Sequence, residues 1–255
     1  MFPILFQYKF LQIGGYGVML GMGFYLAFLL LERELKLRDI NPELAYRILL
    51  GAIPGGIVGS KMFHIFEHWS DFTSSWQSAK SMIFSGEGLS AYGGFVLAAI
   101  ICFIIIRKSG EDFLTVGDAV APSMALGYCF GRFGCHVAGD GCYGVVSTLG
   151  IATPYPNGIV PTTTPVLPTP FFEVYFSFIV FALLMQLRKL DWPVGRIFFL
   201  YMILNGLPRF LVEFVRLNPR GPLGLSQAQV IGILLIIGGI AGWIWTGRRK
   251  TAAAA

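Results

Sequence analysis

The sequence predicts an all-α integral membrane protein with seven transmembrane helices, on the basis of its composition and of seven long apolar stretches. Of its 255 residues, 55% are hydrophobic and only 13% are charged, whereas soluble proteins carry about 25% charged residues. A membrane-spanning helix needs about 20 mostly apolar residues. Helices satisfy their own backbone hydrogen bonds in lipid, and alternating strand patterns are absent, so a barrel is not expected. The seven stretches, read as one membrane domain, cover residues 15–31, 46–66, 88–106, 116–134, 171–187, 194–214 and 228–246.

Three of the expected spans contain a basic residue. Lys61 lies in the second span, Arg132 in the fourth and Arg209 in the sixth. An ionisable group within a span is costly, and it usually marks a functional site.

The placement of basic residues predicts the orientation of the chain. Cytoplasmic loops carry an excess of lysine and arginine. Twelve of the nineteen basic residues follow the first, third and fifth spans or end the chain. We therefore expect the N-terminus outside and the C-terminus in the cytoplasm. The twelve are Arg33, Lys36, Arg38, Arg47, Arg107, Lys108, Arg188, Lys189, Arg196, Arg248, Arg249 and Lys250, whereas Lys9, Lys80, Arg216 and Arg220 lie on the outer side.

Two outer segments are expected at the membrane interface. The loop 136–170 has no lysine or arginine and is rich in threonine and proline, which predicts an extended or irregular segment. The loop 67–87 contains Trp69 and Trp76. We expect both, as loops or short helices, to cover a lateral opening. The final residues 251–255 are expected to form a disordered tail.

Polar chemistry is concentrated after the fourth span, in the stretch 131–144. It contains Cys135, His136, Asp140 and Cys142 among several glycines. The cysteines lack the CxxC spacing typical of zinc sites, so we expect no metal and no cofactor. Cys135 and Cys142 can bridge if their loop faces an oxidising compartment, which spacing alone does not decide. No basic patch supports a nucleic-acid partner, and the net charge of +5 suits membrane lipid.

Arg132 and Arg209 are the main candidate site residues. Both are expected near the outer ends of their spans, where a guanidinium group suits a lipid phosphate because its fork makes bidentate bonds. The offsets of four and seven from Arg209 place Glu213 and Arg216 on the same helix face. The alternative is structural pairing, of Arg209 with Glu213 and of Arg132 with Asp118 or Asp140. Two such arginines near one surface favour phosphate binding.

Tyrosine and glycine residues near the outer ends of the first and third spans have two interpretations. Gly93 and Gly94 follow Tyr92, and Tyr16 lies among glycines of the first span. These residues either contact a lipid headgroup or combine an interfacial tyrosine with close helix packing.

Glu173 and His136 also allow two interpretations each. Glu173 near the start of the fifth span either complements the helix dipole or faces an arginine-lined cavity. His136 is either a general base or an interfacial polar group.

Taken in order along the whole chain, these motifs resemble the prolipoprotein diacylglyceryl transferase family of seven-helix bacterial inner-membrane enzymes. The Arg132 and Arg209 motifs are specific in combination. Asp140 stands where the family usually has an acidic residue. The similar segments are Tyr16-Gly17, Gly88–Gly94, Asp118, Gly131–Gly134, Gly139-Asp140, Pro168-Thr169, Glu173, Gly206, Arg209-Phe210, Glu213-Phe214, Arg216 and Gly224–Gln227.

The chain departs from the family pattern at four positions. Tyr92 and Leu167 stand where the family usually has histidine, Cys135 where it has asparagine, and Asn205 where it has tyrosine. The histidine at the Tyr92 position is a candidate base in the family. The departure therefore indicates a divergent member with a different proton acceptor or altered chemistry.

The resemblance implies transfer of diacylglyceryl from phosphatidylglycerol to the lipobox cysteine of prelipoprotein signal peptides, with release of glycerol phosphate. It implies a site on the outer, periplasmic side, where Arg132 and Arg209 hold the phosphate and Tyr92 or His136 assists proton removal. One alternative is a lipid-binding relative that has lost the chemistry or uses another acceptor, and a second is a small-solute transporter. The residues expected to bind substrate are Tyr16, Gly93, Gly94, Asp118, Gly134, Asp140, Glu173, Glu213 and Arg216.

Overall fold

A computed structural model describes residues 1–8, 11–84, 91–221 and 224–253, with side chains for all of these except 11, 84, 91, 92 and 249–253. The chain forms two compact units, Met1–Leu31 with Gly117–Ala255, and Glu32–Val116. The helices α1 and α6 each begin in one unit and end in the other.

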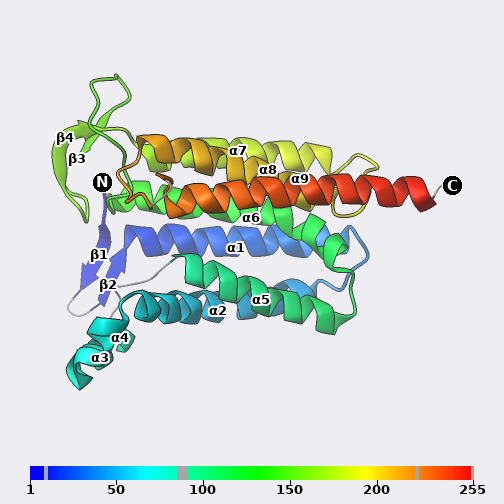
Figure 1. Ribbon diagram of the computed structural model, residues 1–255, viewed down its shortest axis with the longest axis horizontal. Helices are drawn as coiled ribbons and strands as arrows, with labels where there is room; N and C mark the ends of the chain where they lie inside the picture. The colour runs from blue at the N-terminus through cyan, green and yellow to red at the C-terminus, as the bar shows by residue number, and fades with distance from the viewer. Residues whose placement is uncertain (9–10, 85–90, 222–223, 254–255) are drawn as a thin grey trace. The chain divides into compact units, whose positions relative to one another are not determined.

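The larger unit is built from long helices and two short hairpins (Figure 1). Side chains of α6, α7 and α8 form its buried core, which contains Ala125, Val180, Leu184, Ile197 and Tyr201. The elements are β1 (Ile4–Tyr8), β2 (Leu11–Gly14), α1 (Gly15–Lys36), α6 (Phe113–Ala138), β3 (Thr153–Tyr155), β4 (Thr162–Val166), α7 (Thr169–Leu187), α8 (Arg196–Val212), the 3₁₀ turn η1 (Glu213–Val215) and α9 (Gln227–Ala253).

The smaller unit consists mainly of two long helices, α2 (Glu43–Glu67) and α5 (Ala91–Ser109). The short helices α3 (Trp69–Ser74) and α4 (Trp76–Phe84) follow α2. The loop 67–87 was expected to contain either irregular loops or short helices, and its described part contains these two short helices. Trp76 is 83% exposed and Trp69 is 58% exposed, which is typical of aromatic residues at a membrane interface.

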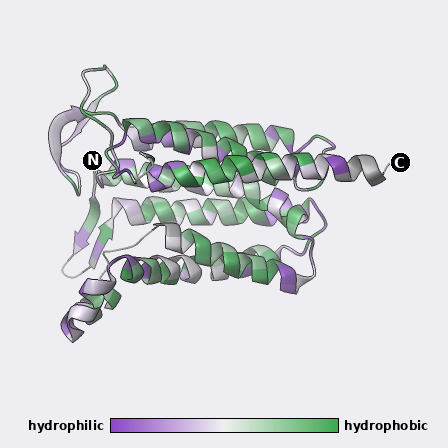
Figure 2. Ribbon diagram, in the orientation of Figure 1, coloured by the Kyte–Doolittle hydropathy of each residue, from purple (hydrophilic) through white to green (hydrophobic). Residues whose placement is uncertain are grey.

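Six of the described helices are long and apolar enough to cross a membrane: α1, α2, α6, α7, α8 with η1, and α9. Figure 2 shows their predominantly hydrophobic surfaces, with hydrophilic residues gathered near helix ends. The expected span 88–106 begins within residues 85–90, which lie outside the described part, and the described helix there is α5.

Several segments differ from what the sequence predicts. Residues 4–8 and 11–14 form the antiparallel strand pair β1–β2, which no alternating pattern indicated. The loop 136–170 is largely irregular, as predicted, but contains the β3–β4 hairpin. The helix α9 continues to Ala253, so it includes part of the expected tail.

Two local caps fix the starts of α8 and α9. The backbone N–H groups of Gly195 and Phe198 donate to the two carboxylate oxygens of Asp118, at 2.7 and 2.8 Å. Ser226 and Gln229 cap α9 reciprocally, each backbone N–H donating to the other side chain. Asp118 therefore positions α8. A structural pair between Asp118 and Arg132 was one alternative from the sequence, but Arg132 pairs with Glu173 instead.

The packing of α8 on α9 depends on two facing glycines. A Cβ atom at Gly206 would lie 2.7 Å from the Gly232 carbonyl oxygen, and one at Gly232 would lie 2.9 Å from the Gly206 oxygen. Both distances are shorter than van der Waals contact, so the helices approach closely only because neither residue has a side chain.

The first prediction concerns this helix contact. Gly206→Ala should destabilise the protein by about 1–3 kcal/mol, because the added methyl group meets backbone. Gly21→Ala on α1 is the control, since nothing lies within 4 Å of its Cβ position. That change should be neutral or stabilising by about 0.5–1 kcal/mol. Thermal unfolding in detergent tests both variants, and equal midpoints would contradict the proposed packing.

Candidate functional site

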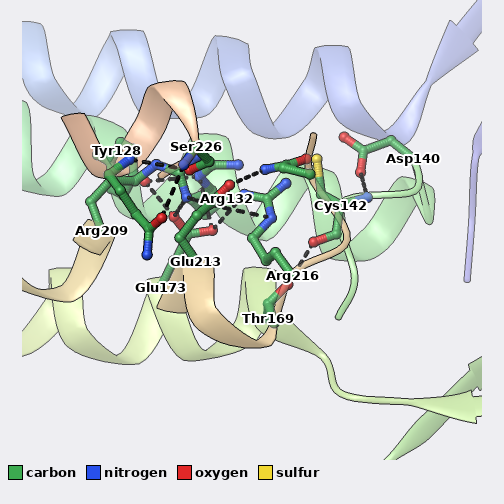
Figure 3. Close-up of polar contacts among 12 residues, drawn as sticks. Tyr128, Arg132, Asp140, Cys142, Thr169, Glu173, Arg209, Glu213, Arg216 and Ser226 are labelled. Atoms are coloured by element: carbon green, nitrogen blue, oxygen red, sulfur yellow. Dashed lines mark hydrogen bonds and ion pairs between the residues drawn. The ribbon is translucent and has the colours of Figure 1, made fainter. Parts of the chain in front are cut away.

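A cluster of charged side chains lies at one end of the larger unit (Figure 3). Its members come from the C-terminal half of α6, the second turn of α7, the last turn of α8, the first residue of η1 and the residue after η1. We call it the arginine cluster, and it consists of Tyr128, Arg132, Glu173, Arg209, Glu213 and Arg216.

Glu173 is the centre of the arginine cluster. Its side chain is 2% exposed, and its carboxylate lies 3.4 Å from Arg132 Nε, 3.4 Å from Arg209 Nη1 and 3.7 Å from Arg216 Nη1. Three guanidinium groups from separate segments thus meet one carboxylate. This arrangement confirms the expectation that Glu173 faces arginines, because a residue that merely complements a helix dipole needs no such partners.

Glu213 is the second carboxylate of the cluster. It accepts a hydrogen bond from Arg209 Nη1 at 2.8 Å, lies 4.0 Å from Arg216 Nε, and accepts another hydrogen bond from Asn218 Nδ2. The predicted Arg209–Glu213 pair is therefore confirmed. The prediction of a continuous helix face is wrong, because α8 ends at Val212 and Arg216 has an extended conformation after η1. Arg216 nevertheless returns to the same carboxylates.

Tyr128 is a member of the cluster that the sequence did not reveal. Its hydroxyl group donates to Glu173 Oε1 at 2.7 Å and accepts from Arg132 Nε at 3.0 Å. The Arg132 guanidinium carbon also lies 5.2 Å from the centre of the Tyr128 ring, within cation–π range. A tyrosine inside an apolar run attracts little notice, but its spacing of four residues before Arg132 was an available signal.

The described cluster carries a surplus positive charge. Three arginines face two carboxylates, which leaves a formal charge of +1. The arginine side chains are only 6–18% exposed, so water screens this charge weakly. A buried guanidinium group without a full anionic complement attracts an anion with oxygen acceptors, and phosphate matches its geometry.

A small pocket with room for about one water molecule adjoins the cluster. Its polar wall includes Glu173, Arg209 and Asn205. The rest of the lining is mostly apolar, so the pocket lies where the charged cluster meets the apolar interior. The lining residues are Tyr128, Glu173, Phe176, Ser177, Val180, Leu204, Asn205, Pro208 and Arg209.

Cys135, Asp140 and Cys142 lie together beside the cluster. Their ligand atoms are all within 4.8 Å of one another, and the structure shows both cysteines unbridged. Hydrogen bonding with the Cys135 thiol lowers the pKa of the Cys142 thiol, and the charges of Arg216 and Arg132 act in the same direction. Asp140 belongs to this group. The sequence also offered Asp140 as a partner for Arg132, but in the described ion pairs Arg132 meets Glu173.

His136 lies in an aromatic environment. Its Nδ1 atom is 3.0 Å from the Tyr155 hydroxyl oxygen, and its ring contacts the rings of Tyr155 and Phe171. Burial raises the pKa of Tyr155 to about 12, so this residue remains a neutral hydroxyl group. The contacts given for His136 connect α6 to the β3–β4 region rather than to the arginines.

Tyr16 and Gly134 meet where α1 packs on α6. A Cβ atom at Gly134 would lie 3.1 Å from Tyr16 Cδ2, so the glycine leaves room for the tyrosine ring. Tyr16 is 40% exposed, which leaves part of it accessible to a ligand.

Gly93 and Gly94 belong to the smaller unit. A Cβ atom at Gly93 would collide with Gly59 and Phe63, and one at Gly94 with Ser60 and Gly56. Both glycines thus permit close packing of α5 on α2, and a role in substrate binding stays a prediction. Tyr92 lies in the first turn of α5, and its side chain is outside the described part of the structure.

The second prediction concerns the stability of the arginine cluster. Glu173→Gln leaves three buried arginines around one remaining carboxylate, so it should destabilise the protein by about 3–5 kcal/mol. Glu43→Gln removes the exposed Arg47–Glu43 pair and should change stability by less than about 1 kcal/mol. Thermal unfolding in detergent measures both, and a small shift for Glu173→Gln would show that the pairs contribute little.

The sequence is similar to known proteins over almost its full length. A family model described as "Prolipoprotein diacylglyceryl transferase" matches residues 3–245. A Clostridium tetani protein named phosphatidylglycerol–prolipoprotein diacylglyceryl transferase is 35% identical over 94% of this chain and 96% of its own. Proteins of the same name from Leptospira interrogans and Dehalococcoides mccartyi are 34% and 32% identical, over 94% and 97% of this chain and 91% and 95% of theirs. The chain belongs to the prolipoprotein diacylglyceryl transferase family.

Proposed function

We propose that this chain is a transferase that moves the diacylglyceryl group of phosphatidylglycerol to a cysteine thiol of a prolipoprotein. Its relatives carry the name of this activity and align with it along almost the whole chain. The observation that carries the proposal is the arginine cluster, with its surplus positive charge in a buried position. A phospholipid presents a matching phosphate.

Arg132 and Arg209 bind the phosphate of the lipid and stabilise the charge that develops on the leaving group. Preorganised charge of this kind is often the largest catalytic contribution in a water-poor site. Glu173 and Glu213 hold the guanidinium groups in place, and Arg216 adds a third cation.

The acceptor is the lipobox cysteine of a prelipoprotein signal peptide. Its thiol loses a proton, because the thiolate is the nucleophile. The sulfur forms a bond to the terminal glycerol carbon of diacylglyceryl, and the carbon–oxygen bond to phosphate breaks with its electron pair on oxygen. Glycerol phosphate leaves, and a thioether remains. We propose Tyr92 or His136 as assistants in proton removal.

The remaining candidate residues complete the proposed substrate site. Tyr16 and Tyr92 contact the lipid headgroup, and Asp140 acts on the site from the adjoining turn, where it lies with Cys135 and Cys142. Gly134, Gly93 and Gly94 allow the backbone to approach the substrate, and Asp118 supports the site by capping α8.

We further propose a seven-span topology in the bacterial inner membrane, with α5 as the span additional to the six above. The N-terminus is outside, the C-terminus is cytoplasmic and the site faces the periplasm. The excess of basic residues in the loops on one side supports this orientation. The arginine cluster lies at the ends of α6 and α8 opposite to that side.

The third prediction tests the arginine roles. Arg132→Gln and Arg209→Gln should each lower the transfer rate by about 100-fold or more, because each removes a charge that stabilises the leaving group. Arg220→Gln is the matched control, since Arg220 is exposed and bonds only a nearby carbonyl oxygen among the contacts described for it. Rates are compared at equal amounts of folded protein. Near-normal turnover by both variants would contradict the roles assigned to Arg132 and Arg209.

The fourth prediction tests the reaction itself. The purified protein should transfer label from phosphatidylglycerol to a lipobox peptide and release glycerol phosphate. A peptide with serine in place of cysteine should accept none. Binding of phosphatidylglycerol without any transfer would instead indicate a non-catalytic relative, and transfer to a different acceptor would indicate altered chemistry.

A further inference from the structure

The side chains of Cys135, Asp140 and Cys142 form a three-ligand group that the described contacts of the arginine cluster do not use. Two sulfur atoms and one carboxylate oxygen all lie within 4.8 Å of one another. A tetrahedral zinc ion with bonds of about 2.0–2.3 Å holds neighbouring ligand atoms about 3.5–3.8 Å apart. The three groups are therefore close to the separation that zinc requires, and small side-chain movements suffice to reach it.

The backbone explains why residues seven apart in the sequence converge here. The helix α6 ends at Ala138, and Gly139 and Gly141 have positive φ angles of 60° and 87°. These left-handed residues on either side of Asp140 turn the chain back, so that Cys142 returns to Cys135 at the end of the helix. The convergence is thus a property of the turn, which the sequence spacing alone did not reveal.

The surroundings fix the ligand groups in place. The Cys142 backbone N–H donates to Asp140 Oδ1 at 3.1 Å, which orients the carboxylate. The Cys142 carbonyl oxygen accepts from Thr169 Oγ1 at 2.6 Å, which ties the turn to the start of α7. Supporting contacts of this kind orient ligands in known metal sites. Cys135 is buried, whereas Asp140 and Cys142 are partly exposed, so the group has an accessible side.

We propose that Cys135, Asp140 and Cys142 bind one zinc ion through two thiolates and one carboxylate. Thiolate ligands select zinc over magnesium and calcium, and the carboxylate oxygen makes a purely thiophilic ion such as copper(I) less suitable. Binding releases the two thiol protons to solvent. The two thiolates, the carboxylate and the ion then sum to a charge of −1.

The three-ligand group lies beside the arginine cluster. Figure 3 shows Cys142 between the arginine cluster and Asp140.

Three protein ligands leave a fourth zinc position open, as in catalytic zinc sites. This part of the inference rests on the proposed function: the open zinc position binds the acceptor cysteine. A coordinating thiol is deprotonated by the ion, and its proton passes to solvent. The thiolate then forms its bond to diacylglyceryl carbon while the phosphate oxygen leaves with its electron pair. This role would replace the histidine that the chain lacks at Tyr92.

The fifth prediction uses cobalt(II) as a visible probe for zinc. The metal-stripped protein should bind one cobalt ion and show thiolate-to-cobalt charge-transfer absorption. Cys135→Ser, Cys142→Ser and Asp140→Asn should weaken binding by at least about 100-fold. Cys102→Ser and Cys129→Ser, which alter cysteines outside the group, should retain it. Elution volume and thermal midpoint establish that each variant is folded.

Several outcomes would overturn the metal site. They are an absent cobalt band in the native sequence, equal binding by all variants, or a disulfide between Cys135 and Cys142 in protein purified without reductant. Addition of a lipobox peptide should shift the cobalt band, and its serine analogue should not. An unchanged band with the cysteine peptide would overturn the open-position role.

The experiment separates this inference from the proposed function. Full transfer activity after chelation, together with no cobalt band, overturns the inference and leaves the transferase intact. A normal cobalt band in a protein that transfers nothing supports the metal site and contradicts the proposed function.

Discussion

The fold of the larger unit depends at its functional end on one carboxylate, that of Glu173. This side chain comes from α7 and meets arginines from α6, from α8 and from the segment after η1. Each arginine would be costly in a buried position without an anion, and the carboxylate would be costly without the arginines. The three segments can therefore end where they do only because their charges meet. The three ion pairs of this one carboxylate thus link four parts of the chain.

The same ion pairs support the proposed phosphate binding. Complete neutralisation of the arginines would stabilise the fold most, but it would leave no attraction for an anion. The cluster instead keeps one charge uncompensated and fills the remaining space with the hydroxyl group of Tyr128, which bonds both Glu173 and Arg132. Stability and function therefore place opposite demands on the same residues, and the balance of three cations with two anions satisfies both.

The departures from the family pattern also concern this end of the unit. Cys135 replaces the usual asparagine and lies with Asp140 and Cys142, while Asn205 replaces the usual tyrosine and lines the small pocket. Two of the four departures thus line or adjoin the candidate site. They alter the chemistry next to the arginines while the arginines themselves remain. This pattern suits the proposed lipid phosphate site with a changed environment for the acceptor thiol.

The sequence by itself determined the helical class, the helix positions and the pair of arginines, because hydrophobic runs and charges within them are local properties. The Arg209–Glu213 pair, which helix spacing offered as the structural alternative to phosphate binding, is present in the structure. Only the tertiary structure decided that Arg132 pairs with Glu173, that Asp118 caps α8, and that Cys135 meets Cys142. These contacts join residues on different helices or across a turn. Their geometry depends on helix packing and on left-handed glycines, which no local pattern encodes.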